Sequence, residues 1–453
     1  MLGVSAVAAT ELLHHLRSSP DVARLLSILE RGPAAYIVGG TVRDLLLGRE
    51  PLDLDVVVDG PLDPLLALLG APARAHDQFE TATLMLGDVR CDLARSRSER
   101  YARPGALPQV RPAPIEQDLL RRDFTVNAIA LAVSGTRAGE LLFAPRALED
   151  LDAGLLAVLY ERSFSDDPTR LLRLIRYSSR LGFGVRASTY ALVTGAVSAG
   201  AVATVAGPRL GAELRLLAAE PEPVSALAAL APFGLDAAVE LGFGLDGREP
   251  AVTALALLGD DGDRAALALA VALLGIAEAG RLVLLARLGF DATRRDLIAE
   301  TARLGPALAP RLRRARAASS VAAAVGRAPL EAVALAGALG ARTNAQRWIE
   351  QLRFVALSIT GADVVAAGVA PGPAVGAGLR AALAAKLDGR VGDSDGELAE
   401  ALRRARGRAG GADRAGGADC ADRAGGADRA DRAGGVDCAG SADGPDCAGR
   451  AEG

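Results

Sequence analysis

The chain is poor in aromatic residues and cysteine, and neither sign of charge dominates it. Aromatic residues make up 3% of the 453 residues, there are 4 cysteines, and the formal net charge is −4. Whole-chain charge therefore does not indicate nucleic-acid binding, so any RNA binding requires a local basic surface. The three cysteines near the C-terminus form no Cys-x-x-Cys pair, which disfavours a zinc site.

Long hydrophobic runs are also missing. Every apolar run approaching the length of a membrane span is interrupted by a charge or a glycine. The N-terminus lacks the basic start, apolar core and cleavage site of an export signal. The remaining cysteine, Cys91, fits a reducing compartment. We therefore expect a cytoplasmic protein with no membrane partner.

Ala and Leu dominate what is present, a composition typical of helices. Residues 1–150 mix short strands with helices, whereas strand signals vanish from about residue 150 onward. The sequence therefore predicts an α+β fold: a mixed-sheet head (1–150) followed by an all-α neck (151–235) and an all-α body and tail (236–405). Helix breaks are expected at Gly and Pro clusters, which include positions 207–208, 221–223, 306 and 371–373.

Residues 406–453 differ from the rest, because they iterate the unit Arg-Ala-Gly-Gly-Ala-Asp. Such small and charged residues cannot bury a core, so this segment is predicted to be disordered.

Three local patterns are predicted within the head. Residues 81–93 indicate a hairpin that turns at Gly87-Asp88. Residues 96–114 are rich in Arg, Pro and Gly and indicate a mobile loop. Residues 125–131 indicate a helical segment preceded by Arg122 and Asp123. Asp123 and Asn127 are expected to organise the turn and Phe124 to lie in the core; a capping Asp123 and a surface Arg122 are the alternative.

The most informative stretch starts with a short apolar run, Ala35–Val38, which predicts a buried strand. Gly39 and Gly40 follow, and without Cβ atoms they permit a tight turn and close approach to a ligand. Thr41 is expected to cap the next helix and Arg43 to lie in its first turn. Backbone N–H groups at a helix start, together with an arginine, favour binding of a triphosphate.

A second strand follows within the same stretch, at residues 52–58. Side chains alternate across a strand, so Asp53 and Asp55 are expected to share one face. Two neighbouring carboxylates are suited to Mg²⁺, which takes oxygen ligands. Asp92, on the predicted hairpin, is either a third metal ligand or a structural hydrogen-bonding residue, and we favour the second. Asp44 is expected to pair with a basic neighbour.

A helix predicted to begin near Asp166 bears on substrate choice. Asp166 or Ser165 can cap it and Pro168 suits its first turn. Asp167 and Arg170 are expected on one face, and Arg173 and Arg176 continue it; a set of solvated ion pairs is the alternative. A carboxylate accepts a hydrogen bond from an exocyclic amine, and a guanidinium donates one to a ring nitrogen. Asp167 with Arg170 would therefore select C and A over U and G.

Three ordered segments, residues 39–58, 121–128 and 166–177, resemble the signatures of class II tRNA nucleotidyltransferases and bacterial poly(A) polymerases, within the polymerase-beta-like superfamily. Weaker similarity continues through residues 207–209 and 360–373. The resemblance implies a two-metal mechanism with Asp53 and Asp55 as Mg²⁺ ligands. It also implies that Arg122 contacts the incoming nucleotide. The other residues expected at the nucleotide are Gly39, Gly40, Arg43, Asp167, Arg170, Arg173 and Arg176.

The resemblance implies addition of CCA to the 3′ end of tRNA from CTP and ATP. A relative that adds only A, to tRNA or as a poly(A) polymerase, is the alternative, because the chain has Asp166-Asp167 where the family often has Glu-Asp. A catalytically dead RNA-binding scaffold is a third reading. The basic cluster of Arg311, Arg313, Arg314 and Arg316 is either an RNA phosphate contact or a solvated helix face.

Deleting residues 410–453 should change neither the melting temperature nor the rate of nucleotide addition, because the repeat lacks apolar surface with which to dock. The measurements are thermal unfolding and turnover of the full-length and truncated chains. Loss of soluble expression or of tRNA affinity on truncation would show that the segment has a role.

Overall fold

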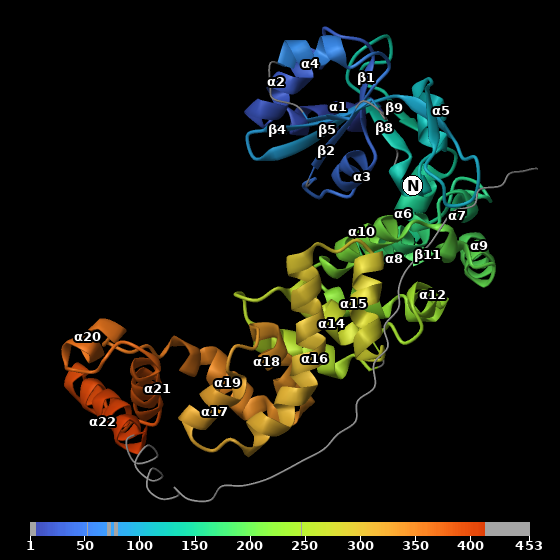
Figure 1. Ribbon diagram of the computed structural model, residues 1–453. Coiled ribbons are helices and arrows are strands. Elements are labelled where there is room, and N and C mark those ends of the chain that lie inside the picture. The colour runs from blue at the N-terminus through green and yellow to red at the C-terminus, as the bar shows by residue number, and fades with distance from the viewer. Residues whose placement is uncertain (1–5, 52, 70–73, 77–79, 246, 413–453) are drawn as a thin grey trace, which may run out of the picture. The chain divides into compact units, whose positions relative to one another are not determined.

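The computed structural model of the protein describes residues 6–51, 53–69, 74–76, 80–245 and 247–412. The chain divides into two compact units. The first comprises residues 1–357 with 383–392, and the second comprises residues 358–382 together with the chain from Asp393 onward. The first unit contains the head, the neck and most of the body. The prediction of a mixed-sheet head followed by helices is confirmed (Figure 1).

The head is built on a sheet in which, among the described residues, seven strands are hydrogen-bonded side by side. In spatial order they are β3 (Arg74–His76), β4 (Thr81–Leu86), β5 (Val89–Arg95), β2 (Asp53–Val58), β1 (Ala35–Val38), β8 (Ile129–Ala132) and β9 (Leu141–Phe143). β2 and β5 are parallel, whereas the other neighbours are antiparallel. The predicted β4–β5 hairpin is confirmed, with Leu86 opposite Val89.

Helices cover both faces of this sheet. The head helices are α1 (Ala6–Leu16), α2 (Pro20–Leu29), α3 (Gly40–Leu46), α4 (Asp63–Leu69), α5 (Ile115–Leu120) and α6 (Ala147–Asp152). Leu54 and Val56 of β2 share one core with Leu25 of α2 and Leu65 of α4. Val57 faces the other way and packs with α5. β2 therefore alternates as predicted, which places Asp53 and Asp55 on the Val57 face.

Two local predictions in the head are wrong. Residues 96–114 contain a hairpin, β6 (Arg97–Arg100) and β7 (Gln109–Pro112), in place of a mobile loop. Its arginine-rich sequence is ordered by ion pairs such as that of Glu99 with Arg121. Residues 125–131 form only a 3₁₀ turn, η2 (Thr125–Asn127), before β8 begins. β8 is buried on both faces, and a short continuous apolar run has no period that separates strand from helix.

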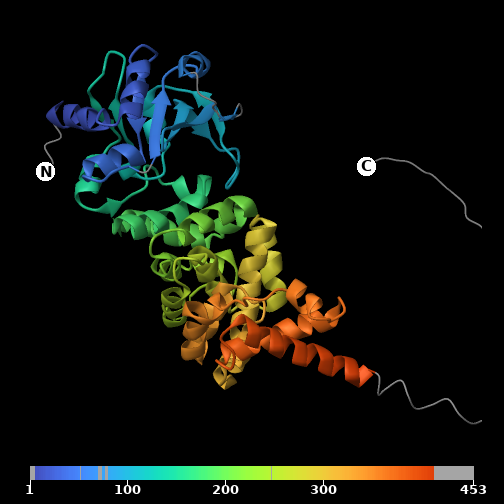
Figure 2. The same ribbon diagram turned by 90° about the vertical axis from the view of Figure 1, so that its left-hand side faces the viewer.

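The neck is largely helical, and its elements are α7 (Ser163–Asp166), α8 (Thr169–Leu181), α9 (Ala187–Ser198), η3 (Ala201–Thr204), α10 (Gly207–Ala218), α11 (Pro223–Ala228), η4 (Ala231–Phe233) and α12 (Leu235–Val239). One small parallel pair, β10 (Leu155–Leu156) and β11 (Gly184–Val185), contradicts the expectation that strands end near residue 150. In Figure 2 the green neck helices lie beneath the blue strands of the head.

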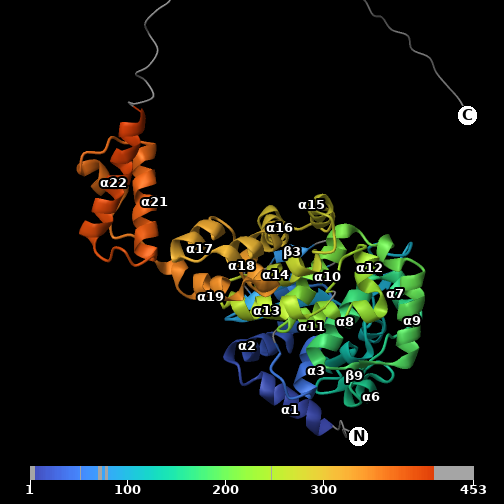
Figure 3. The same ribbon diagram turned by 90° about the horizontal axis from the view of Figure 1, so that it is seen from below.

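The body consists of α13 (Glu249–Leu258), α14 (Arg264–Ala272), α15 (Glu278–Arg287), α16 (Ala292–Arg314), α17 (Ala318–Val325), α18 (Leu330–Ala336), η5 (Gly337–Ala341), α19 (Arg342–Glu350) and η6 (Leu352–Phe354). α16 packs against α14 and α18 (Figure 3). Its buried Leu308 and Leu312 join Leu335 of α18 in one core.

The predicted helix break at Pro306 is wrong, because Pro306 lies inside α16. Proline lacks the N–H that would bond the carbonyl four residues earlier, and an orphaned buried carbonyl is costly. Here that carbonyl belongs to Ala302, and it accepts a hydrogen bond from Nη1 of Arg281 at 3.0 Å. A side chain of α15 thus replaces the missing backbone donor, and the helix continues.

The second unit contains α20 (Gly361–Ala366), the first part of α21 (Pro373–Leu387) and all of α22 (Ser394–Ala412). The buried Glu397 carboxylate accepts hydrogen bonds from the N–H groups of Ser358 and Ile359. α22 runs past residue 406 to Ala412, so the prediction of disorder is wrong for this stretch. The rest of the repeat lies outside the described residues.

Among the described residues no single helix is long and apolar enough to cross a membrane. The segments Ala318–Val325 and Leu330–Phe354 meet that test only as a pair, and they are bent by 117°.

Substituting Gly211 should destabilise the protein, because α10 packs against the end of α15 without room for a side chain. A Cβ at Gly211 would lie 1.9 Å from the carbonyl oxygen of Leu288. We expect Gly211→Ala to lower the free energy of unfolding by roughly 1–3 kcal/mol, measured by urea unfolding. Gly195 of α9 has no neighbour within 4 Å, so Gly195→Ala is the matched control and should raise stability by roughly 0.5–1 kcal/mol. Equal effects of the two substitutions would contradict the packing argument.

Candidate functional site

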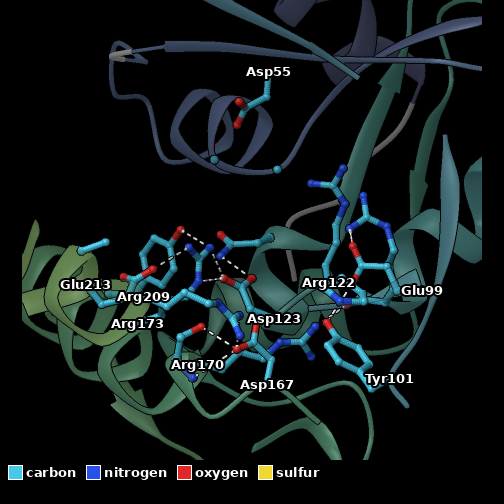
Figure 4. Close-up of a pocket in the computed structure, with 18 residues that line it drawn as sticks. Asp55, Glu99, Tyr101, Arg122, Asp123, Asp167, Arg170, Arg173, Arg209 and Glu213 are labelled. Carbon is cyan, nitrogen blue, oxygen red and sulfur yellow. Dashed lines mark hydrogen bonds and ion pairs between the residues drawn. The ribbon is translucent and has the colours of Figure 1, made fainter. Parts of the chain in front are cut away.

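A cavity of about 490 Å³ lies where the head meets the neck. Head elements contribute Gly39, Gly40, Asp55, Glu99, Tyr101, Pro108, Arg121, Arg122, Asp123 and Asn127, and neck elements contribute Asp167, Thr169, Arg170, Arg173, Tyr177, Arg209, Ala212 and Glu213. Figure 4 shows Asp55 on one side of this cavity and Asp167, Arg170 and Arg173 on the opposite side. The predicted metal-binding carboxylate Asp55 and the predicted base-selecting residues Asp167 and Arg170 come from distant parts of the sequence. They therefore face the same cavity from opposite sides.

The turn at Gly39 requires glycine for two reasons. Its φ is +66°, in the left-handed region that favours glycine. A Cβ there would also lie 2.8 Å from Nη1 of Arg122 and 3.6 Å from Oδ2 of Asp55. The absent side chain thus leaves room for the Arg122 guanidinium beside the turn.

Thr41 does not cap α3 as predicted. Its hydroxyl donates to the carbonyl oxygen of Asp53 and accepts from the N–H of Asp55, both at 3.0 Å. Thr41 therefore joins the start of α3 to the two residues of β2 that carry carboxylates. This arrangement fixes Asp53 and Asp55 relative to the Gly39-Gly40 turn.

Asp53, Asp55 and Asp92 lie on one face of neighbouring strands, with Asp55 directly opposite Asp92 in the β2–β5 register. Asp92 accepts a hydrogen bond from Thr83 at 2.5 Å and pairs with Arg90 at 3.0 Å. These bonds support its structural role. Asp53 is exposed and does not line the cavity, whereas Asp55 is half-buried and does.

The carboxylates of β2 suit a divalent cation. Burial raises the pKa of the Asp55 carboxyl above its usual value, and although Arg122 opposes this rise, the negative charges of Asp92 and Asp53 add to it. Within the described part of the chain, no ion pair neutralises Asp53 or Asp55, and no group of three or more metal-binding side chains occurs. Two carboxylates are nevertheless sufficient for Mg²⁺, because substrate phosphates and water commonly complete its coordination shell.

Arg43 lies beneath the Gly39-Gly40 turn and does not line the cavity. Its side chain is 2% exposed, and it bonds Oδ1 of Asn127 at 2.6 Å and Oδ1 of Asp44 at 2.8 Å. The predicted pairing of Asp44 with a basic neighbour is thus present in the structure. Direct contact of Arg43 with a triphosphate has no support in this geometry.

Asp123 connects the turn at residues 123–127 of the head to helix α8 of the neck. Its Oδ1 accepts from the N–H of Phe124 and from Nδ2 of Asn127, at 2.8 and 3.0 Å, as expected for a residue that organises the turn. Its Oδ2 pairs with Nη2 of Arg173 at 2.6 Å. Burial disfavours the charged form, but the charge and hydrogen bond of Arg173, the hydrogen bond from Asn127 and the charge of Arg170 together outweigh burial and hold the pKa of Asp123 well below its usual value.

Arg122 points into the cavity beside Gly39. Its Nη2 bonds Oδ2 of the buried Asp118 at 2.9 Å, and Arg121 bonds Oδ1 of the same carboxylate at 2.7 Å. Although burial opposes ionisation of Asp118, these two arginines lower its pKa. Arg122 is therefore placed by a fixed negative charge and leaves part of its guanidinium facing the cavity.

Asp167 precedes α8 instead of lying within it. The helix begins at Thr169, and Oδ1 of Asp167 accepts hydrogen bonds from the Thr169 N–H and hydroxyl at 3.2 and 2.7 Å. The expected capping by Asp166 or Ser165 is wrong, because α7 ends at Asp166 and a break separates the two helices. The ion pair of Asp167 is with Arg209, at 2.8 Å.

Arg170 is 5% exposed, which contradicts the alternative of ion pairs on a solvated helix face. Its Nη1 donates to Ser163 and Tyr160 at 2.7 and 3.2 Å, and its Nη2 donates to the carbonyl oxygen of Arg121 at 2.7 Å. Arg170 and Asp167 thus both line the cavity while each is held by other residues.

Arg173 lines the cavity, but Arg176 does not. Arg176 lies behind Glu213, 3.6 Å from its carboxylate, and its guanidinium is 4.8 Å from the centre of the Tyr177 ring. The sequence prediction placed both arginines at the nucleotide. In the structure Arg176 supports the wall of the cavity from behind.

Several lining residues were not predicted: Glu99, Tyr101, Arg121, Tyr177, Arg209 and Glu213. Glu99 and Tyr101 lie in the segment interpreted as a mobile loop, so no local signal placed them at a site. Arg209 follows the predicted helix break at Gly207-Pro208, and the weak family similarity of residues 207–209 was the available clue. The Arg311, Arg313, Arg314 and Arg316 cluster is exposed at the end of α16, away from this lining.

The Gly-Gly turn, the carboxylates of β2 and the arginine-rich wall have the architecture of a nucleotidyltransferase head. Residues 35–157 match the poly A polymerase head domain. The resemblance to tRNA nucleotidyltransferases and poly(A) polymerases inferred from the sequence is therefore confirmed.

Relatives extend the similarity beyond that domain. The chain is 43% identical over 44% of its length to a CC-adding tRNA nucleotidyltransferase of Deinococcus radiodurans, covering 53% of that protein. It is 40% identical over 44% of its length to an A-adding tRNA nucleotidyltransferase of Geobacter sulfurreducens, covering 23% of that protein. The matched region thus spans about half or less of these curated relatives. The structure of the Thermotoga maritima CCA-adding enzyme complexed with tRNA is similar over 87% of this chain and 98% of that one, with a TM-score of 0.70 and 28% identity.

Asp55→Asn should stabilise the protein at pH 7 in the absence of divalent metal. A carboxyl whose pKa is raised by folding opposes ionisation, so above that pKa the charged form lowers the free energy of unfolding. The gain should disappear as the pH falls below the usual pKa of Asp, where the wild-type carboxyl is protonated in both states. Urea unfolding in EDTA across pH measures this difference.

Asp92→Asn is the control for that measurement. It relieves part of the repulsion on Asp55 but loses the ion pair with Arg90 and the hydrogen bond from Thr83, so any gain in stability at pH 7 should be smaller than that of Asp55→Asn. A similar gain in both variants, or no gain for Asp55→Asn at pH 7, would contradict the burial argument.

Proposed function

We propose that this chain is a template-independent tRNA nucleotidyltransferase that adds CCA to the 3′ end of tRNA from CTP and ATP. The observation that carries the proposal is the single cavity with Asp55 and the Gly39-Gly40 turn on one side and Asp167 and Arg170 on the other. A nucleotide spanning this cavity would present its triphosphate to the head and its base to the neck. The similarity to a CCA-adding enzyme over most of the chain supports the same reading.

Asp53 and Asp55 are the residues that would hold Mg²⁺. When bound, the metal supplies positive charge at the reacting phosphate and favours ionisation of the attacking hydroxyl. In our proposal, the backbone of Gly39 and Gly40 together with Arg122 binds the triphosphate. Arg43 acts from beneath the turn, where its buried charge stabilises that backbone.

Asp167 and Arg170 select the base in this proposal. Cytosine and adenine present an amine beside an acceptor nitrogen, which matches a carboxylate beside a guanidinium. Uracil and guanine present a carbonyl oxygen beside an N–H and match neither group. Arg173 is bound to Asp123 and supports this wall, and Arg176 supports it from behind.

The exposed arginine cluster at the end of α16 is proposed to contact tRNA phosphates. Arg311, Arg313 and Arg316 are exposed, and no carboxylate in the described residues pairs with them. The net negative charge of the chain makes such a local basic surface the place where RNA would bind.

Two narrower specificities are the competing candidates. The Geobacter relative is A-adding and the Deinococcus relative is CC-adding, and both are more than a third identical to this chain over the matched region. Poly(A) addition to RNA generally is a further A-only alternative. All of these use the same cavity, so the product and not the site distinguishes them.

The test is incubation with tRNA lacking its 3′ end, and with tRNA ending in CC, each with single labelled nucleotides. We expect C and then A to be added in sequence, and Asp53→Ala or Asp55→Ala to abolish addition while tRNA binding stays nearly unchanged, because each substitution removes a metal ligand that should not touch RNA. A alone on CC-ending tRNA would support the A-adding candidate, and C alone the CC-adding one. Wild-type turnover in either variant would refute the metal assignment.

Asp167→Ala should relax discrimination against UTP and GTP and slow addition of C and A. A hydrogen bond to a charged group is worth roughly 1.5–3 kcal/mol, or about ten- to hundredfold in selectivity. The measurement is kcat/KM for each nucleotide. An equal loss for all four nucleotides would leave Asp167 with a structural role only.

A further inference from the structure

Strand β9 leaves one edge of the head sheet open. Among the described residues it is the last strand of the sheet, and its partner on the inner side is β8 (Figure 1). At its two ends, the carbonyl oxygen of Glu140 and the N–H of Ala144 bond toward β8. Hydrogen-bonding direction alternates along an antiparallel strand, so the backbone of Leu142 also bonds β8, whereas Leu141 and Phe143 direct their N–H and C=O groups outward. No hydrogen bond within the described part of the chain uses these outward groups.

A largely apolar groove of about 330 Å³ follows this open edge. Its lining includes Leu141, Leu142 and Phe143, whose side chains alternate between the two faces of the sheet. A cavity that is lined from both faces of one strand lies beside the edge of that strand. Phe143 and Leu120 of α5, which also lines the groove, are 49% and 50% exposed. Exposed apolar side chains beside unpaired strand groups mark a surface that can pair with another chain.

The two ends of β9 carry opposite charges. Glu140 precedes the strand, and Arg137 pairs both with it and with Glu116 of α5, at 2.9 and 2.8 Å. Two carboxylates share one guanidinium there, so this end keeps a negative charge. Arg146 follows the strand, is exposed, and forms no ion pair among the described residues. A strand that is acidic at one end and basic at the other is electrostatically complementary to an antiparallel copy of itself.

The backbone groups of a second copy fit this edge in one register. With a two-fold axis at Leu142, Leu141 of each copy lies opposite Phe143 of the other, so every outward N–H and C=O gains a partner. A shift of the pairing in one direction would set Leu141 opposite Pro145, which has no N–H. A shift in the other direction would set Phe143 opposite Gly139, whose N–H already bonds the last residue of β8.

The same register joins the charged ends. Arg146 of each copy comes opposite position 138 of the other copy and diagonal to its Glu140. Diagonal neighbours on paired strands are within reach of long side chains, so both ends of the pairing gain an ion pair. The arrangement is isologous, because each contact occurs again with the roles of the two copies exchanged, and it closes at two chains.

We propose that two copies of this chain associate through the open edge of β9, in an antiparallel pairing centred on Leu142 that covers Phe143 and Leu120. The proposal does not depend on the proposed function. β9 is short, so the interface is small and the pair is expected to form reversibly at micromolar concentrations. The lining of the groove and the lining of the cavity between head and neck share no described residue, so nucleotide addition does not require the pairing.

The experiment measures the mass of the full chain by sedimentation between about 1 and 100 µM, together with hydrogen exchange of the β9 amides. The variants are Phe143→Lys, Glu140→Arg and Arg146→Glu. Met85→Lys is the matched control, because Met85 is also an exposed apolar strand residue, 57% exposed, but lies on the interior strand β4 and does not line the groove.

The wild-type mass should rise with concentration from that of one chain, 46.2 kDa, toward that of two. Exchange at Leu141 and Phe143 should slow in step, because their N–H groups become bonded. Phe143→Lys should weaken association by at least about tenfold, because it brings an unpaired ammonium to the edge of each copy. Met85→Lys should associate as the wild type does, and both variants should keep the wild-type rate of nucleotide addition per chain.

The charge variants test the register. Glu140→Arg and Arg146→Glu should each weaken association, because like charges then meet at both ends of the pairing. A mixture of these two single variants should associate again as a mixed pair. In that pair the introduced arginine meets the introduced glutamate at one end, and the native Glu140 meets the native Arg146 at the other.

A chain that remains single at about 100 µM would overturn the proposal, and so would association that persists in Phe143→Lys or that Met85→Lys weakens equally. Failure of the mixed single variants to associate would overturn the register. Slower exchange at β9 that requires added tRNA and occurs without a change in chain number would assign the edge to RNA and overturn the pairing. Nucleotide addition is assayed separately, so its absence bears on the proposed function alone.

Discussion

The ion pair between the buried Asp123 and the half-buried Arg173 is the interaction on which the cavity depends. Asp123 belongs to the turn that follows α5 in the head, and Arg173 belongs to α8 of the neck, with their closest atoms 2.6 Å apart. Asn127 extends the network to Arg43 beneath the Gly39-Gly40 turn. Removing Arg173 would be costly, because it would leave the buried Asp123 carboxylate without its charged partner. The network therefore fixes the distance across which a nucleotide would lie.

The ring of Tyr177 contacts the arginines of this network. The guanidiniums of Arg43, Arg173 and Arg176 lie 5.3, 5.7 and 4.8 Å from the centre of its ring. Three like charges would repel one another in a low-dielectric site, but the face of an aromatic ring attracts cations and nearby carboxylates neutralise them. Arginines from a head helix and a neck helix can therefore share one small volume. The low aromatic content of the chain makes the placement of this tyrosine notable, since few other rings could serve.

The sequence predicted what is local and missed what is made by contacts between distant segments. The order of β1, the Gly-Gly turn, α3 and β2 is encoded in adjacent residues, and alternation along β2 correctly placed Asp53 and Asp55 on one face. The β6–β7 hairpin was missed because contacts with residues over 20 positions away hold it: Arg121 donates to the Glu99 carboxylate, and the backbone N–H of Arg97 donates to Asp118. No local composition reveals such contacts. Helix α16 likewise continues through Pro306 because of a contact between distant segments, the hydrogen bond from Arg281 of α15 to the Ala302 carbonyl. Burial of Arg43 and the pairing of Asp167 with Arg209 likewise depend on the assembled fold.

Helix α10 carries two stripes that face in nearly opposite directions. Gly207 and Gly211 face the end of α15, whereas Arg209 and Glu213, offset by two residues and so by more than half a turn, face the cavity. The contacts of Gly207 and Gly211 with the end of α15 therefore fix the rotation of α10 about its axis. That rotation in turn decides where Arg209 and Glu213 lie in the cavity. Substitutions where α10 meets the end of α15 would therefore move Arg209 and Glu213, and with them one wall of the cavity, without changing any residue that lines it.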